Sequence, residues 1–130
     1  MEKVTAGRDA LGEFAPEFAR FNDDVLFGEV WSREDKLSPR DRSMITVSAL
    51  MANGILDSSL KYHISHAKEN GVTAEEMAEM LTQLAFYAGW SKAWAAFRMA
   101  KEVYLLFLGR QHKKHCRKNY SRIELRHRAH

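Results

Sequence analysis

Residues 60–77 read LKYHISHAKENGVTAEEM and contain the end of one helix, a turn and the start of the next. The pair Asn70-Gly71 is typical of a helix C-terminus, because glycine readily adopts the left-handed conformation that ends a helix. Soon afterwards, Thr73 and Glu76 have the spacing of a capping box, in which each side chain bonds to the other residue's backbone N–H. The stretch therefore predicts two helices joined by a tight turn, and so lying antiparallel.

The same alternation of apolar helical stripes and stop signals extends in both directions along the chain. No β-branched residues alternate with polar ones over a useful length, and good helix formers dominate the composition. The remaining start and stop signals are Ser38 before Pro39, Asn53 before Gly54, a start near Asp57, and Gly89 before a possible cap at Ser91. We therefore predict an all-α antiparallel helical bundle of about six helices, including a helix over 15–31.

Composition places the chain among globular proteins. It has 130 residues, of which 45% are hydrophobic, enough for one domain with a modest core. No apolar run approaches the ~20 residues that span a bilayer, and residues 1–14 lack the apolar region of a secretory signal. The single cysteine, Cys116, suits a reducing compartment. We therefore expect a cytoplasmic protein with no membrane partner.

Charge divides the chain into two parts. Residues 1–108 hold 12 Lys and Arg against 16 Asp and Glu, whereas residues 109–130 hold 8 against one, with four of the six histidines. We therefore predict a helical domain over 1–108 and a basic, His-rich C-terminal tail over 109–130. The tail has little aromatic content beyond Tyr120 and no nucleic-acid motif, so a solvated extension is favoured over a nucleic-acid contact.

Two histidines, His63 and His66, are candidates for metal ligands or catalytic groups. At ~100° per residue, His63 lies ~60° from the middle of the apolar stripe of its helix, and His66 lies ~120° away. We therefore expect His63 to border the buried face and His66 to point toward solvent. Spacing of three residues without a third ligand does not favour a metal site, since zinc helices usually use i and i+4. His63 is then either a catalytic group or a hydrogen-bonded buried histidine.

The segment WSREDKLSPRDRS, residues 31–43, supplies candidate anion-binding groups. Arg33 and Arg42 offer the bidentate fork that recognises carboxylates, although charged residues in a loop and at a helix start are often simply solvated. Trp31 and Trp90 stand beside a loop and a glycine break. They are candidates either to line a pocket or to pack.

Three segments together resemble the carboxymuconolactone decarboxylase family, within the alkylhydroperoxidase D-like superfamily. They read FGEVWSREDKLSPRDRSMITVSALMANG, then LKYHISHAKENGVTAEEM, then LAFYAGWSKAWAAFRMAKEVY. The resemblance runs from about residue 10 to 107. It implies an all-α fold and assembly into homo-oligomers, either trimers or hexamers.

The peroxidase branch of that superfamily uses a Glu, a CxxC pair and a His. Here His63 occupies the histidine position, but the preceding ILDSSLKY contains no cysteine, and Ser43 falls where the glutamate is expected. Thiol peroxidase chemistry needs a thiolate to attack the peroxide, so this alternative is disfavoured. The decarboxylase branch is closer, with GEVW, a following Arg, RDRS and a His before NGVT.

The decarboxylase resemblance implies a carbon–carbon lyase that acts without a cofactor or metal on a small carboxylated lactone from the breakdown of aromatic compounds. It also implies the roles of seven residues. The catalytic set is His63, Glu29 and Arg42, and the substrate-binding set is Arg33, Trp31, Ser43 and Trp90. The chain is thus predicted to be an enzyme, and a non-catalytic oligomeric module that binds anions remains as an alternative.

Overall fold

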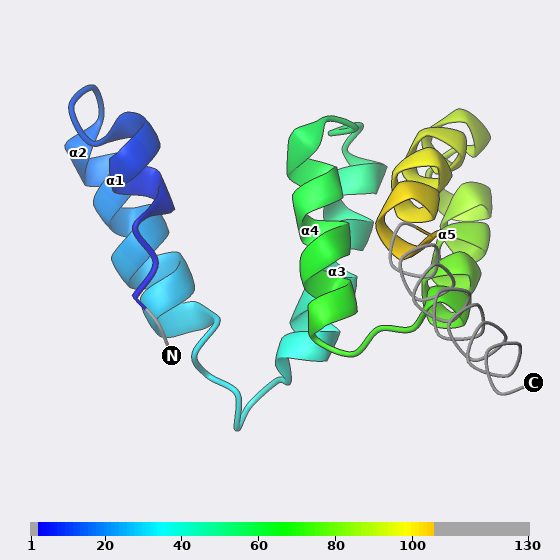
Figure 1. Ribbon diagram of the computed structural model, residues 1–130, viewed down its shortest axis with the longest axis horizontal. Helices are drawn as coiled ribbons and strands as arrows, with labels where there is room; N and C mark the ends of the chain where they lie inside the picture. The colour runs from blue at the N-terminus through cyan, green and yellow to red at the C-terminus, as the bar shows by residue number, and fades with distance from the viewer. Residues whose placement is uncertain (1–2, 106–130) are drawn as a thin grey trace, which may run out of the picture. The chain divides into compact units, whose positions relative to one another are not determined.

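The computed structural model describes residues 3–105, and every regular element in that range is helical (Figure 1). The elements are α1 (Ala6–Leu11), α2 (Pro16–Arg20), η1 (Phe21–Val30), α3 (Pro39–Ala52), α4 (Ser58–Glu69) and α5 (Ala74–Ala88), followed by a helix over 90–105. Because α2 runs directly into η1, the seven elements form six continuous helical segments. The predicted all-α fold is therefore confirmed. The predicted tail, 109–130, lies outside the described residues. No helix within 3–105 is long and apolar enough to cross a bilayer.

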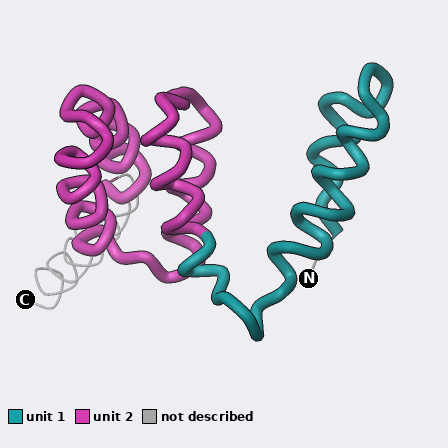
Figure 2. Tube along the Cα trace, turned by 180° about the vertical axis from the view of Figure 1, so that it is seen from behind, with its two compact units in different colours: residues 1–42 teal, residues 43–130 magenta. Residues whose placement is uncertain are grey.

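The chain divides into two compact units, Met1–Arg42 and Ser43–His130 (Figure 2). The boundary falls inside α3, so the first unit contains α1, α2 and η1, and the second contains most of α3 and the helices that follow.

In the first unit, α1 packs against α2 and η1 around the buried carboxylate of Asp23. Its two oxygens accept hydrogen bonds from the backbone N–H groups of Gly7, at 2.8 Å, and Arg8, at 3.0 Å. These are N-terminal groups of α1, which carry no intrahelical partner of their own. A Cβ at position 7 would lie 2.7 Å from Asp23 Oδ1 and 3.0 Å from the carbonyl oxygen of Ala19. Glycine therefore allows the close approach of the two helices.

The helix predicted over 15–31 is present, but its last ten residues, Phe21–Val30, form a π-helix rather than a regular α-helix. At its end the N–H of Trp31 donates to the carbonyl oxygen of Leu26, five residues back, at 2.9 Å. The first unit buries few apolar side chains, with Ala19 and Trp31 its buried hydrophobic residues, while Phe14 is 90% exposed.

The second unit has the main hydrophobic core, to which α3, α4, α5 and the helix over 90–105 each contribute one stripe. Within each helix, the buried residues lie three or four positions apart, as expected for one face of a helix. Burying each large side chain stabilises the fold by about 1.5–3 kcal/mol. The core is made of Val47, Met51, Leu60, Ile64, Ala67, Val72, Met77, Leu81, Ala85, Ala93, Ala96, Ala100 and Tyr104.

Helix boundaries follow the predicted signals closely. Ser38 Oγ accepts from the N–H of Asp41 at 3.1 Å, and Thr73 and Glu76 form the reciprocal capping box. Gly71 and Gly89 both have positive φ angles, 96° and 130°. The predicted cap at position 91 is wrong, because the last helix begins immediately after Gly89, whose carbonyl oxygen accepts from the N–H of Ala93 at 3.2 Å.

Candidate functional site

His63 lies on α4, next to the stripe by which that helix enters the core. The helix starts at a side-chain cap, in which Asp57 accepts from the N–H of Ser59 at 2.9 Å. Leu60 and Ile64 are fully buried, and His63 between them is half-buried, as predicted. Its ring makes an edge contact with Tyr62, with ring centroids 5.0 Å apart and planes at 84°.

His66 is less exposed than its angular position on the helix suggests. The prediction that it points to solvent is wrong, since the side chain is half-buried and its Nδ1 atom is buried, as is Nδ1 of His63. The two rings lie 6.5 Å apart, and the ring of Tyr62 lies 6.0 Å from that of His66. Tyr62, His63 and His66 thus form one cluster of rings on α4, and their close spacing in the motif YHISH indicates this cluster in the sequence.

The surroundings of His63 favour its neutral form. Burial lowers the pKa of the imidazole below its ordinary value of 6.5, and the nearby His66 lowers that pKa further. Both causes act against the positively charged form, the first by desolvation and the second by repulsion. Near neutral pH the ring is therefore an uncharged imidazole that both donates and accepts hydrogen bonds.

Ser43, predicted as a substrate-binding residue, is fully buried on α3. Its hydroxyl oxygen accepts a hydrogen bond from Nδ2 of Asn70 at 2.9 Å. Asn70 caps the C-terminus of α4, with its N–H donating to the carbonyl oxygen of His66 at 2.9 Å. The Ser43–Asn70 bond thus ties α3 to the end of the helix that carries the two histidines. The sequence predicts Asn70 only as part of a helix end, because the partner of its side chain lies 27 positions away.

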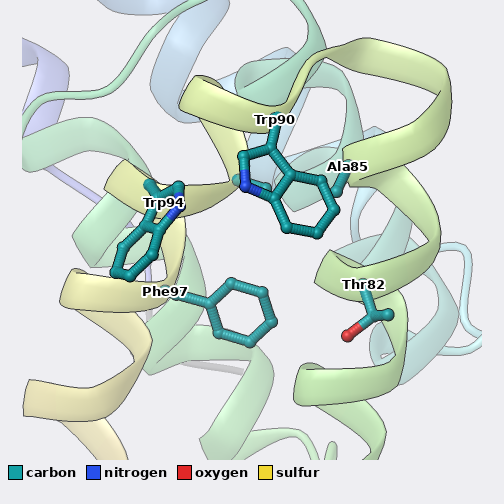
Figure 3. A pocket seen from close by; sticks show the side chains of 6 residues that line it. Thr82, Ala85, Trp90, Trp94 and Phe97 are labelled. Carbon is teal, nitrogen blue, oxygen red and sulfur yellow. The ribbon is translucent and has the colours of Figure 1, made fainter.

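Trp90 lines an apolar groove of about 250 Å³ between α5 and the helix over 90–105 (Figure 3). Trp90, Trp94 and Phe97 face the groove from one helix, and Thr82 and Ala85 face it from the other. The spacing of Trp90 and Trp94, one helical turn apart, is the signal that would have added the second tryptophan to the predicted set. A groove this poor in polar groups suits apolar surface better than a carboxylated molecule.

A second hollow, of about 400 Å³, lies between α3 and α5. It is lined by Met44, Ile45, Ser48, Met80, Gln83 and Leu84. His63 lines neither this hollow nor the groove at Trp90.

The four predicted residues of the first unit lie at and after the end of η1. Glu29 is exposed, whereas Trp31 is buried and stacks on Phe27, with ring centroids 6.1 Å apart. Arg42 donates from Nη2 to the carbonyl oxygen of Arg33 at 3.1 Å and from Nε to that of residue 37 at 3.2 Å. The structure therefore links the two arginines directly, with one guanidinium holding the loop that presents the other.

The seven predicted residues are divided between the two units. Glu29, Trp31, Arg33 and Arg42 belong to the first, and Ser43, His63 and Trp90 belong to the second. Within residues 3–105, no three His, Cys, Asp or Glu side chains gather closely enough to hold a metal ion.

These features define a small all-helical protein with a shielded, neutral imidazole, the type of group that acid–base chemistry uses. The chain belongs to the carboxymuconolactone decarboxylase family, whose model matches residues 16–102. It is 36% identical over 101 residues to a 4-carboxymuconolactone decarboxylase from Acinetobacter baylyi, covering 78% of this chain and 74% of that protein. The resemblance noted in the sequence is thus confirmed, and it supports a decarboxylase-like function and an enzyme of the lyase type.

Proposed function

We propose that this chain is a cofactor-free decarboxylase of a small carboxylated lactone, active in the breakdown of aromatic compounds. The observation that carries the proposal is the half-buried His63, held neutral by its surroundings, in a chain 36% identical to a 4-carboxymuconolactone decarboxylase. We further propose that the protein is a cytoplasmic homo-oligomer, a trimer or a hexamer. Its many exposed aromatic side chains support self-association.

The reaction places simple demands on the protein. Breaking the bond to the carboxylate releases CO2 and leaves an electron pair that spreads through the ring alkene into the lactone carbonyl. The substrate therefore supplies its own electron sink. What the protein supplies is a cation for each carboxylate, a hydrogen-bond donor for the developing oxyanion, and a proton for the carbon.

His63 supplies the proton in this scheme. The free protein keeps the imidazole neutral, because burial and His66 lower its pKa. A bound carboxylate raises that pKa, since it stabilises the imidazolium form. His63 thus takes up a proton when the substrate binds and delivers it to the carbon once CO2 has left.

The other residues have supporting roles. The resemblance assigns carboxylate binding to Arg33 and Arg42, orientation of the histidine to Glu29, and exclusion of water to Trp31 and Trp90. Because Trp90 lines a groove that His63 does not line, its position does not favour that role. The resemblance assigns Ser43 to substrate binding, but its burial and its bond to Asn70 favour a positioning role at the end of α4.

The test is turnover of 4-carboxymuconolactone, followed by CO2 release, in His63→Gln and in Glu69→Lys, a control at an exposed position of the same helix. We expect His63→Gln to lower kcat by roughly 100-fold or more, as loss of a general acid does, with helix content and assembly unchanged. The control retains activity. A wild-type protein without turnover refutes the substrate, and a His63→Gln variant as active as wild type removes His63 from the mechanism.

His66→Gln gives a second test of the electrostatic argument. Because His66 lowers the pKa of His63, its removal raises that pKa. We expect turnover to persist and the pH profile to shift toward higher pH.

Hydroperoxide consumption that survives Cys116→Ser, with no decarboxylation, would support the peroxidase alternative instead.

A further inference from the structure

Tyr62 lies directly before His63 on α4, and the rings of these two residues are in edge contact. Their centroids are 5.0 Å apart and their planes meet at 84°, which is the geometry of a favourable edge-to-face pair. Consecutive residues point ~100° apart around a helix and do not ordinarily face each other. The two side chains must therefore lean toward each other to make this contact.

His66 closes the cluster from the next turn of α4. Around the helix axis it lies ~40° from Tyr62 and ~60° from His63, between the two. Because helical side chains tilt toward the N-terminus, the ring of His66 leans back over the turn that holds the other two. The centroid distances agree with this placement, at 6.0 Å to Tyr62 and 6.5 Å to His63. The imidazole of His63 is thus in contact with one ring and bordered by another.

The ring contact lies outside the hydrophobic core. Tyr62 is 57% exposed, whereas Leu60 and Ile64, two positions before and two positions after it, are fully buried. Its ring meets the rings of the two histidines, and exchange for another side chain leaves the core stripe of α4 in place. A role in holding the imidazole therefore accounts for this tyrosine better than core packing does.

The orientation of His63 matters because of the reaction proposed for it. The second side-chain torsion of histidine has a broad, roughly two-fold preference, so rotation about it carries the two ring nitrogens through a wide arc. A proton donor has to lie within ~2.6–3.2 Å of the atom that it protonates. A ring contact that restricts this torsion raises the fraction of molecules whose imidazole is correctly aimed before the substrate arrives.

We propose that Tyr62 is a positioning residue, whose ring holds the imidazole of His63 in the orientation that proton delivery requires. The inference rests on the proposed function, since it concerns the same histidine. The ring contact is the essential feature and the phenol hydroxyl is not, so phenylalanine replaces this tyrosine and an aliphatic side chain does not. Tyr62 is not among the seven residues to which the resemblance assigns a role.

The first measurement is made on the protein without substrate. The order parameter of the Cδ2–H bond of His63, from ¹³C relaxation of histidine-labelled protein, reports how far the ring is restricted on the ps–ns timescale. The signal that is missing from His63→Gln identifies His63. We expect the order parameter to fall in Tyr62→Leu and to keep its wild-type value in Tyr62→Phe. Tyr87→Leu makes the same change at an 85% exposed tyrosine of α5, and this matched control leaves the order parameter unchanged.

Turnover of 4-carboxymuconolactone gives the second measurement. Loss of an aromatic pair weakens the preference for one ring orientation by about two- to tenfold. We expect kcat of Tyr62→Leu to fall by about that factor while KM is unchanged, because the contact restricts the histidine and does not bind the substrate. Tyr62→Phe keeps the ring and retains the wild-type kcat.

The two measurements separate this proposal from the proposed reaction. An unchanged order parameter in Tyr62→Leu overturns the positioning role whatever the activity. A Tyr62→Phe variant with a kcat as low as that of Tyr62→Leu overturns it as well, since the ring alone is then not sufficient. A wild-type protein without turnover refutes the reaction, and the order parameter still decides whether Tyr62 holds the imidazole.

Discussion

Replacing Ser43 by Ala separates two roles for this residue, a bond to substrate and a bond that holds α4. The change removes one hydroxyl, which accepts a single hydrogen bond from Asn70 in the structure. Such a bond contributes about 0.5–1.5 kcal/mol to stability. Asn70 is half-buried and regains part of this from water, so we expect the free energy of unfolding to fall by about 1 kcal/mol.

A double-mutant cycle with Asn70→Ala measures the bond itself, using urea unfolding of the wild type, the two single variants and the double variant. If the Ser43–Asn70 bond is the main interaction of both side chains, the double variant loses little more than either single variant. The expected coupling energy is about 0.5–1.5 kcal/mol, above the scatter of about 0.3–0.5 kcal/mol for independent sites.

Turnover measured on the same four proteins decides the functional role. A positioning role predicts that Ser43→Ala and Asn70→Ala change kcat and KM alike, because both release the end of the helix that carries His63. A rise in KM for Ser43→Ala that Asn70→Ala does not reproduce would refute this reasoning and make the hydroxyl a substrate ligand.

Three further predictions concern stability. Leu81→Ala removes a fully buried core side chain, and we expect a loss of about 2–5 kcal/mol in the free energy of unfolding, measured with urea. Thr73→Ala breaks the capping box of α5, and the same measurement is expected to show a loss of about 1 kcal/mol; an unchanged value would mean that the cap contributes nothing. The lowered pKa of His63 means that below pH 6.5 the unfolded chain binds this proton more readily than the folded one, so stability falls with decreasing pH until the folded pKa is passed. Urea unfolding of wild type and His63→Gln between pH 8 and 5 checks this, and equal slopes in the two proteins would contradict it.

Helix positions were predictable from the sequence because their signals are local. Asp57 caps α4 through a backbone group two residues away, and Thr73 and Glu76 bond to each other's backbone three residues apart. Gly71 and Gly89 end helices because few other residues adopt their backbone angles without strain. Such interactions depend on a few neighbouring residues, and the sequence contains all of them.

Interactions between distant residues were not predictable in the same way. The hydrogen bond from Asn70 to Ser43 joins residues 27 positions apart, and the bond from Gly7 to Asp23 joins residues 16 positions apart. The burial of His66 depends on what packs against α4, which a helical projection of that helix alone does not contain. The π-helical hydrogen bond of Trp31 is also not predicted by a helical pattern that assumes 3.6 residues per turn.

The sparse apolar interior of residues 3–42 has a consequence for hydrogen exchange. Backbone amides exchange with solvent through local openings, whose free-energy cost depends on how much buried apolar surface each opening exposes. In α1, α2 and η1 that surface is small, because Trp31 is the only large apolar side chain buried within 3–42. Deuterium should therefore enter these helices well before it reaches the amides of α4 and α5, whose opening disrupts the shared core around Leu60 and Leu81.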